Sequence, residues 1–384
     1  MVLSATELQA RTELGRFLIA RRAEAPTFLP PGQVAALPQA VPAPELTGKF
    51  PTGLAPSAHA PDPNAGPTDK LPRADVVVVT WTVDENDALA AVLTPGFSSR
   101  SWSPYSRRYA SHYARLIRAG APAKQAKRLG RWLRTDVGGM SVVCFKSELH
   151  LNQDGIRDPN VPGTATLPVK GLFAQLIDEV QPNVVITTGT SGGVFADHDL
   201  GDVVVTRAAK FRLQSEFRNA PFNGKTFRSQ WDVPKTHFAT ATDLMHSFAD
   251  HLKEPPLLPP TIRHSGKPFQ APTFTPDIKL DGTGDLPEFH PILTTDYFEY
   301  GTSANNLQQE GCAVEMGDAV LGLVADELAA PPKWVVVRNL SDPQINGELD
   351  HDLQVDYAVW YYEKFGFWTS IMSALTTWAI IAGL

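Results

Sequence analysis

The sequence contains little cysteine, and this scarcity excludes several kinds of protein. Only Cys144 and Cys312 occur in 384 residues, too few for a disulfide framework or a cysteine-based zinc site. The ten histidines show no H-x-x-x-H or comparable spacing of metal ligands. We therefore expect no metal site and a cytoplasmic location.

A signal sequence and a membrane anchor are also not indicated. The first residues include acidic ones and lack the apolar core of a signal peptide. Residues 366–384 carry no charged side chain and approach the length of a membrane span. Thr369, Ser373, Thr376 and Thr377 nevertheless recur at helical spacing along this segment. Such a one-sided polar stripe favours a packed terminal helix and no membrane contact.

Acidic residues outnumber basic ones overall, with two basic regions as exceptions. A net charge of −7 argues against general nucleic-acid binding. Residues 98–135 nevertheless hold ten Lys or Arg and no Asp or Glu, with few aromatic residues between them. A second cluster begins with Arg207, Lys210 and Arg212. Two interpretations stay open for both regions. The first is a solvated helical face, or a face that pairs with an acidic surface on another subunit. The second is recognition of substrate phosphates by arginine forks.

The chain divides into an N-terminal arm and one folded body. Residues 1–73 are expected to form a short amphipathic helix and then a proline- and alanine-rich arm. The body spans 74–384 and carries expected insertions at about 98–135 and 254–290. The second insertion is proline-rich and too long for an ordinary connection, which favours a lid or an interface element.

Strand and helix patterns alternate along the body. Continuous apolar runs predict strands buried on both faces, and runs of helical period lie between them. This alternation predicts an α/β domain with a central mixed, twisted sheet flanked by helices, and ligands beyond the carboxyl ends of the strands. The strands are expected at 74–83, 141–145, 183–188, 202–206, 292–295 and 334–339, and the helices at 169–179, 241–252, 313–328 and 353–364.

Three segments bring residues suited to chemistry to those strand ends. VVITTGTSGGV (184–194) is expected to be a strand that runs into a turn with Gly189, Gly192 and Gly193, and the amides and hydroxyls of this turn suit an oxyanion or a sugar. CAVEMGDAV (312–320) is expected to open a helix with acidic residues, and WVVVRNLSDPQ (334–344) to end a strand in an aspartate. Each also has an ordinary structural interpretation, as a tight turn, a helix N-terminus or an aspartate before proline. The candidate binding residues are Thr190, Ser191, Gly192, Glu315, Met316, Asp318, Arg338, Ser341 and Asp342.

In this order, the motifs resemble those of the nucleoside phosphorylase and nucleosidase superfamily. The resemblance rests on TTGTSGG followed by LGDVVV, then VEM, then VVVRNLSD, and covers about residues 74–384 without the insertions. The superfamily includes purine nucleoside phosphorylases, methylthioadenosine/S-adenosylhomocysteine nucleosidases and AMP nucleosidases. The resemblance implies a single phosphorylase/hydrolase-like domain, a small-molecule nucleoside or nucleotide as partner, no cofactor, and a homo-oligomer, either dimer or hexamer.

The resemblance also implies roles for individual residues. Asp342 matches the general acid toward the departing base, and Met316 matches the methionine beneath the ribose. Phe298, in TTDYFEYG, falls where the family places an aromatic side chain that stacks on the base. Thr190 and Ser191 match the turn that touches the ribose and its attacking nucleophile.

One position departs from the family pattern. Members commonly read VEME, with the second glutamate holding the ribose hydroxyls, whereas this chain has Gly317 followed by Asp318. Either Asp318 or Glu315 takes over that contact, or ribose binding is altered. The departure keeps open an alternative of another class, a member that binds a nucleoside or serves as a structural protein without catalysis.

Glu85 bears on the choice between hydrolysis and phosphorolysis. It follows the first strand, in TWTVDENDAL, at the position of a water-activating glutamate in the nucleosidases. A carboxylate beside the nucleophile repels phosphate and orients or deprotonates water, although it also suits the first turn of a helix. We expect an N-ribosyl hydrolase that frees the base of a purine nucleoside or nucleotide. A phosphate-dependent purine nucleoside phosphorylase is the alternative, and Arg207, Lys210 and Arg212 are candidate ligands if the substrate carries phosphate.

Overall fold

The structure is a computed structural model that describes residues 3–21, 45–46, 48–252 and 275–384. Much of the expected proline-rich arm and residues 254–274 of the expected insertion therefore lie outside the described residues. The α-helices of the described residues are α1 (Ala5–Arg21), α2 (Val83–Leu93), α3 (Pro122–Ala126), α4 (Pro168–Val180), α5 (Phe238–His246), α6 (Ala319–Glu327) and α7 (His351–Ala382).

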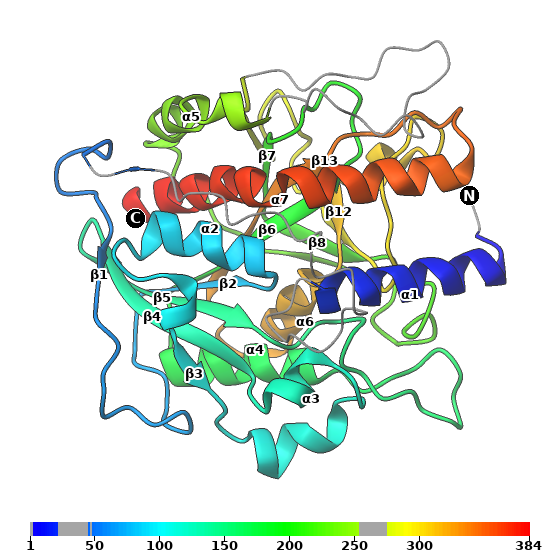
Figure 1. The fold of residues 1–384 in the computed structure, drawn as a ribbon, viewed down its shortest axis with the longest axis horizontal. Helices are drawn as coiled ribbons and strands as arrows, with labels where there is room; N and C mark the ends of the chain where they lie inside the picture. The colour runs from blue at the N-terminus through cyan, green and yellow to red at the C-terminus, as the bar shows by residue number, and fades with distance from the viewer. Residues whose placement is uncertain (1–2, 22–44, 47, 253–274) are drawn as a thin grey trace, which may run out of the picture.

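One 13-stranded sheet forms the centre of the part of the chain that the structure describes (Figure 1). The neighbours β5, β2, β6 and β13 are parallel, whereas β12 runs antiparallel to β6 and β7 antiparallel to β13. The strands are β1 (Ser57–Ala58), β2 (Val76–Thr80), β3 (Ser103–Tyr105), β4 (Gly130–Val137), β5 (Met140–Ser147), β6 (Val184–Gly193), β7 (Val203–Thr206), β8 (Ala208–Phe211), β9 (Thr226–Arg228), β10 (Ile278–Leu280), β11 (Ile292–Thr294), β12 (Ala313–Glu315) and β13 (Lys333–Asp342).

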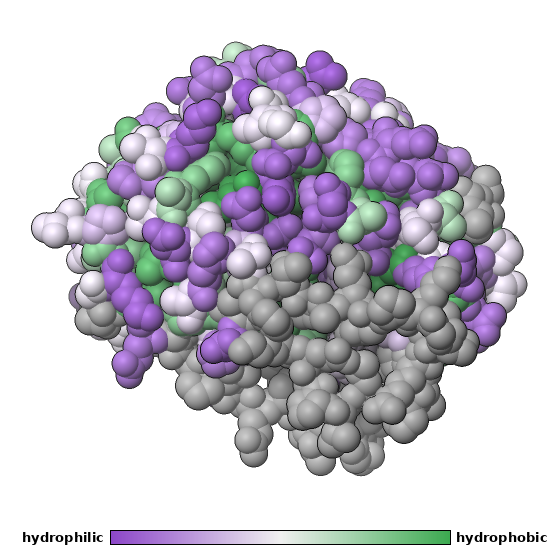
Figure 2. Space-filling view, turned by 90° about the horizontal axis from the view of Figure 1, so that it is seen from above, coloured by the Kyte–Doolittle hydropathy of each residue, from purple (hydrophilic) through white to green (hydrophobic). Residues whose placement is uncertain are grey.

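Helices cover both faces of the sheet, and β2 shows how the sequence specifies this arrangement. Val76 and Val78 pack into the core that contains α2, α5 and α7, whereas Val77 and Val79 pack into the core that contains α4 and α6. Because successive side chains of a strand point to opposite faces, an unbroken apolar run requires cover on both. Apolar side chains are largely withdrawn into these cores, and hydrophilic ones predominate on the described part of the face in Figure 2. The predicted α/β fold with a mixed, helix-flanked sheet is confirmed.

The C-terminal segment is packed inside the protein, as its polar stripe predicted. It continues α7, which by length and composition could span a membrane, but 89% of the apolar 18-residue window behind that criterion is buried within the molecule. The stripe faces the sheet: Asn339 Nδ2 donates to Ser373 Oγ at 2.9 Å, and Thr377 Oγ1 donates to Thr188 Oγ1 at 3.1 Å. Ser373 and Thr377 thus pair with polar groups of β13 and β6, whereas Thr369 and Thr376 donate to carbonyl groups of α7 itself.

The N-terminal segment lies against the body of the protein. Arg11 and Arg16 of α1 form ion pairs with Glu299 at 2.8 Å and Glu216 at 2.6 Å. Further along, β1 pairs antiparallel with β4, and beyond the undescribed part of the second insertion β10 pairs parallel with β7. The division of the chain at residues 73 and 74 stays a prediction.

Three expected elements differ from the structure. The turn expected around Gly189, Gly192 and Gly193 is wrong, because β6 continues as a strand from Val184 to Gly193. The single helix expected over 313–328 is wrong, because residues 313–315 form β12, paired with β11 and β6, and α6 begins only at Ala319. Sheet pairing on both sides outweighs the local helical pattern there. The helical face considered for residues 98–135 is also wrong in part, since the segment contains β3, the short α3 and most of β4. Arg107, Arg118 and Arg128 form ion pairs with glutamates of the same chain.

Candidate active site

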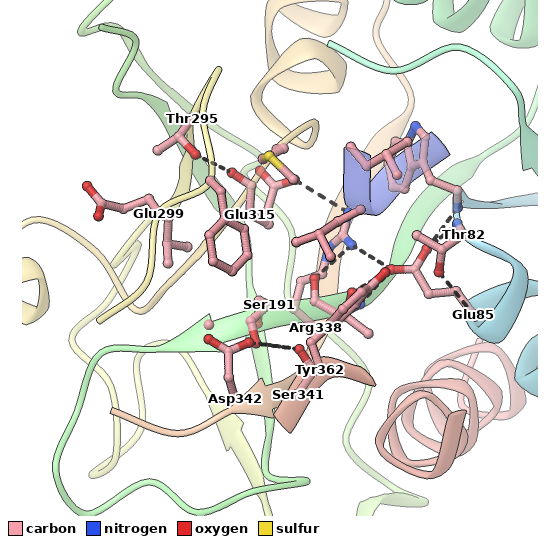
Figure 3. A pocket seen from close by; sticks show the side chains of 18 of the residues that line it. Thr82, Glu85, Ser191, Thr295, Glu299, Glu315, Arg338, Ser341, Asp342 and Tyr362 are labelled. Carbon is pink, nitrogen blue, oxygen red and sulfur yellow. Dashed lines mark hydrogen bonds and ion pairs between the residues drawn. The ribbon is translucent and has the colours of Figure 1, made fainter. Parts of the chain in front are cut away.

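A pocket opens at the carboxyl ends of the central strands. Its empty space is about 650 Å³, a value that includes open solvent at its mouth. The walls come from the ends of β2, β6, β12 and β13, and from α1 and α7 (Figure 3). The predicted site residues that line it are Glu85, Thr190, Ser191, Gly192, Phe298, Glu315, Met316, Arg338, Ser341 and Asp342.

Strand pairing brings these distant segments together. Because β2, β6 and β13 are parallel, their carboxyl ends meet at one edge of the sheet. Val314 of β12 lies opposite Gly192 of β6, which places Glu315 beside the glycine-rich end of that strand. An irregularity between Leu340 and Asp342 also sets Asp342 opposite Gly192. A Cβ on Gly192 would lie 2.9 Å from Asp342 Oδ2, so the glycine makes room for this carboxyl group.

Asp342 is a buried carboxyl group with few hydrogen-bond donors. Its side chain receives one hydrogen bond from the described residues, donated by Ser341 Oγ to Oδ1 at 3.0 Å. Burial raises the pKa of Asp342 to about 8, and the Ser341 hydroxyl lowers it only in part. Asp342 is therefore protonated at neutral pH and can donate its proton to a bound molecule.

Glu85 is equally buried but has many donors. Its Oε2 accepts hydrogen bonds from Thr80 Oγ1, Trp81 N and Thr82 N at 2.8–3.1 Å, and its Oε1 accepts from Thr190 N and Oγ1 at 2.8 and 2.9 Å. Burial alone would raise the pKa of Glu85, but the Arg338 guanidinium and the backbone amides outweigh it and lower the pKa. Glu85 also completes a capping box with Thr82 at the start of α2. Glu85 therefore lies in the first turn of a helix and also lines the pocket.

Arg338 is the centre of an acidic cluster. Its Nε and Nη2 donate to the two carboxylate oxygens of Asp318 at 2.8 and 2.7 Å, and it lies 3.7 Å from Glu85 and 3.6 Å from Glu315. Burial opposes its charge, but Asp318 and the two glutamates raise the pKa of Arg338. The guanidinium is therefore held in place as a fixed positive charge, 4.9 Å from the centre of the Trp81 ring.

The two acidic residues near Gly317, Glu315 and Asp318, point in different directions. Asp318 is fully buried against Arg338 and is absent from the pocket lining, whereas Glu315 faces the pocket. Burial and then the nearby Asp318 charge raise the pKa of Glu315 to about 8. A Cβ on Gly317 would lie 3.4 Å from the Trp81 indole. Of the two residues expected to replace a glutamate at 317, only Glu315 reaches the pocket.

Several pocket residues were missed by the sequence analysis. His150 follows β5, and Thr82 and Trp81 follow β2, so the strand-end rule applied to every strand would have found them. Leu18 and Ile19 of α1 carry no sequence signal for a binding site, because an apolar helix face is also typical of simple packing. The other residues missed are Thr295, Glu299, Val314 and Tyr362.

The candidate phosphate ligands do not reach the pocket. Arg207 bonds to Asp281 at 3.2 Å, and Lys210 lies 3.2 Å from Glu310. Arg212 Nη1 donates to Glu299 Oε2 at 2.7 Å, so it borders the pocket only through a residue that lines it. Their positive charges are thus balanced by carboxylates of the same chain.

The pocket is acidic. Its lining among the described residues includes four carboxyl groups, those of Glu85, Glu299, Glu315 and Asp342, and a single guanidinium, that of Arg338. In the same described part of the chain, no group of three or more His, Cys, Asp or Glu has the arrangement of a metal site. The site can therefore donate a proton at Asp342 and stabilise positive charge near Glu85, but it offers little to attract an anion.

Known proteins resemble this chain in sequence over part of its length and, more distantly, in structure. The family model described as the phosphorylase superfamily matches residues 114–364. No curated protein sequence matches the chain. Among solved structures, it is similar to a 5′-methylthioadenosine/S-adenosylhomocysteine nucleosidase from Neisseria meningitidis, with 16% identity, a TM-score of 0.43, and coverage of 81% of this chain and 100% of the other. It is also similar to the futalosine hydrolase of Helicobacter pylori, with 12% identity, a TM-score of 0.44, and coverage of 80% and 97%.

Proposed function

The chain belongs to the phosphorylase superfamily, and we propose that it is an N-ribosyl hydrolase that cleaves the N-glycosidic bond of a purine nucleoside. The observation that carries the proposal is the position of Asp342, which is buried in the pocket wall with a single hydrogen-bond donor, Ser341 Oγ, among the described residues. A buried carboxyl group with a pKa of about 8 keeps its proton at neutral pH. It can therefore deliver that proton to a purine nitrogen as the base departs.

The reaction breaks one bond and forms another at the anomeric carbon. The C1′–N9 electron pair moves onto the purine, which receives the proton of Asp342. The oxygen of a water molecule bonds to C1′, and this water loses one proton to solvent. Asp342, which gave its proton to the base, takes up one proton from solvent. The products are the free base and ribose, and the chemistry requires no cofactor.

Glu85 is proposed to act as a fixed negative charge beside the sugar. Five protein donors occupy its oxygens, and a carboxylate has about four lone-pair sites. It is therefore a poor acceptor for a proton from water, but it stays ionised and stabilises the positive charge that develops on the ribose. This role differs from the water activation expected from sequence.

The charge of Glu85 supports water over phosphate as the nucleophile, whereas Asp342 and Glu315, with pKa values of about 8, are largely neutral at pH 7. A phosphate dianion would enter beside Glu85, and the guanidinium that could attract it is already bound to both carboxylate oxygens of Asp318. Like charges at close range disfavour each other. The same argument favours a nucleoside over a 5′-nucleotide, because Arg207, Lys210 and Arg212 are paired elsewhere.

Chromatography of free base tests the proposal. The full chain is incubated with purine nucleosides and the matching 5′-monophosphates, with and without inorganic phosphate. We expect base and free ribose from a nucleoside, with no dependence on phosphate. Formation of ribose 1-phosphate would instead identify a phosphorylase, and tight base binding without turnover of any substrate would identify a non-catalytic member.

A further inference from the structure

His150 is a pocket residue that the proposed reaction does not use. It follows β5, lies in the pocket wall and is 9% exposed. The charged groups that act on the pKa of His150 are Glu85, which raises it, and Arg338, which lowers it. It therefore belongs to the Glu85 end of the pocket, which lies across Arg338 from Asp342 in the view of Figure 3.

A short chain of hydrogen bonds fixes the orientation of the imidazole. Asn152 Nδ2 donates to the Met316 sulfur at 3.4 Å, and Asn152 Oδ1 lies 2.9 Å from His150 Nδ1. A thioether sulfur can only accept, so the amide turns its NH₂ toward Met316 and its oxygen toward the ring. Because that oxygen also only accepts, Nδ1 must carry the ring proton.

The remaining ring nitrogen, Nε2, is consequently an acceptor. Burial, opposed in part by the Asn152 hydrogen bond, lowers the pKa of His150 to about 4. The ring is therefore neutral at neutral pH, and Nε2 keeps its lone pair. None of the hydrogen bonds among the described residues uses this atom.

The carboxyl groups of the pocket other than Asp342 are mostly engaged. Glu85 accepts five hydrogen bonds, as described above. Glu315 Oε1 accepts from Thr294 Oγ1 and from Asp318 N, and Glu299 receives Arg11 and Arg212. A ribose that enters this end of the pocket brings hydroxyl groups that lose water, and a buried hydroxyl without an acceptor is costly.

We propose that His150 Nε2 accepts a hydrogen bond from a hydroxyl of the ribose 2′,3′-diol and thereby selects ribonucleosides over deoxynucleosides. The inference rests on the proposed function, which puts the base at Asp342 and the sugar toward Glu85. Asn152 acts as a positioning residue, because it holds the ring in the tautomer that presents the lone pair. Gly317, which has no side chain, leaves this contact to neighbouring residues.

The test compares sugars in a His150 variant. Initial rates are measured for a ribonucleoside substrate and its 2′-deoxy and 3′-deoxy forms with the wild-type protein and with His150→Phe, which keeps a ring but removes both nitrogens. We expect the wild type to lose about tenfold in kcat/KM on one deoxy form, the energy of one buried hydrogen bond. His150→Phe should lose about the same factor on the ribonucleoside and no longer distinguish that deoxy form.

A second variant and a binding measurement keep the outcome decisive. His150→Gln places an amide oxygen near the position of Nε2 and should recover part of the discrimination, also if the Phe variant fails to fold. Equal discrimination in wild type and variants would overturn the proposal, as would an equal loss on all three sugars, which points to the attacking water. If the wild type releases no base at all, the proposed function fails, while calorimetric affinities for the same three nucleosides still decide the His150 contact.

Discussion

The two buried acids of the pocket, Asp342 and Glu85, differ in protonation although both are almost completely enclosed. Asp342 accepts one hydrogen bond and has a pKa raised to about 8. Glu85 accepts five, lies 3.7 Å from the Arg338 guanidinium and has a lowered pKa. Burial acts in the same direction on both, so the number of donors and the nearby cation decide the outcome.

The edge of the sheet at the carboxyl ends of the strands thus supplies both a proton donor and a fixed negative charge. Both acids lie against glycines of β6: a Cβ on Gly192 would meet Asp342, and one on Gly189 would meet Glu85. The backbone of β6 donates to Glu85 through Thr190 N, but no backbone amide of the described residues reaches the carboxyl group of Asp342. Opposite protonation states therefore arise from local backbone geometry.

The largest effect is expected from removing the acid at the base end. Asp342→Asn keeps the shape of the side chain but cannot transfer a proton, so we expect kcat to fall by about 10²–10⁴-fold. The measurement is base release at saturating substrate, with free-base affinity and thermal unfolding as controls for an intact pocket. A wild-type rate in this variant would refute the assignment of Asp342 as the acid.

The next largest effect is expected from neutralising the other acid. Glu85→Gln removes the negative charge and turns an NH₂ group toward backbone donors, so we expect kcat to fall by about 10²-fold and stability to fall by about 1–3 kcal/mol. Asp87→Asn is a matched control on the same helix, because Asp87 is outside the pocket lining. Similar losses in both variants would mean that the charge acts through α2 and not on the substrate.

A smaller change should sharpen the comparison by making Glu85 more like Asp342. Thr190→Val removes the Oγ1 donor but keeps the backbone amide, so the pKa of Glu85 should rise. Because Glu85 acts in its ionised form, the acidic limb of the kcat profile should move to higher pH, by about one unit. Thr188→Val removes a buried hydroxyl of the same strand that does not contact Glu85 and should leave that limb in place.

The last prediction concerns stability and its dependence on pH. The unfolded pKa of an aspartate is about 4, so between about pH 4 and pH 8 the folded protein holds a proton on Asp342 that the unfolded chain has lost. Stability should therefore fall as pH rises through this window. Glu315, with a pKa also raised to about 8, adds to the slope. The free energy of unfolding, measured with urea at several pH values in this range, should vary less with pH in Asp342→Asn than in the wild type. An unchanged dependence on pH would contradict the raised pKa.

Much of the fold was accessible from the sequence because the signals were local. The apolar run of β2 and the helical period of α4 depend on residues close in the chain. The segment 313–315 was assigned to a helix because its strand character comes from pairing with β11 and β6, which lie far away in sequence. Long-range pairing of this kind leaves little trace in a short window.

The site was accessible only in part. Motifs at strand ends located ten lining residues, including Asp342 and Glu85. The opposite protonation of the two acids was not predictable, since it depends on which amides and hydroxyls of other segments point at each carboxyl group. His150 and the α1 residues were missed because neither follows a recognisable motif, and the cationic residues past β7 were given a role that their carboxylate partners make unnecessary.

The position of α1 has a practical consequence for experiments on shortened versions of this protein. The superfamily match begins at residue 114, but Leu18, Ile19, Trp81 and Glu85, which form one side of the cavity, come before it. A clone trimmed to the matched segment would retain Asp342 and discard its counterpart. A lack of activity in such a fragment would not show that the intact protein is inactive. Deletion of residues 1–21 alone would instead measure what the first helix adds to ligand affinity.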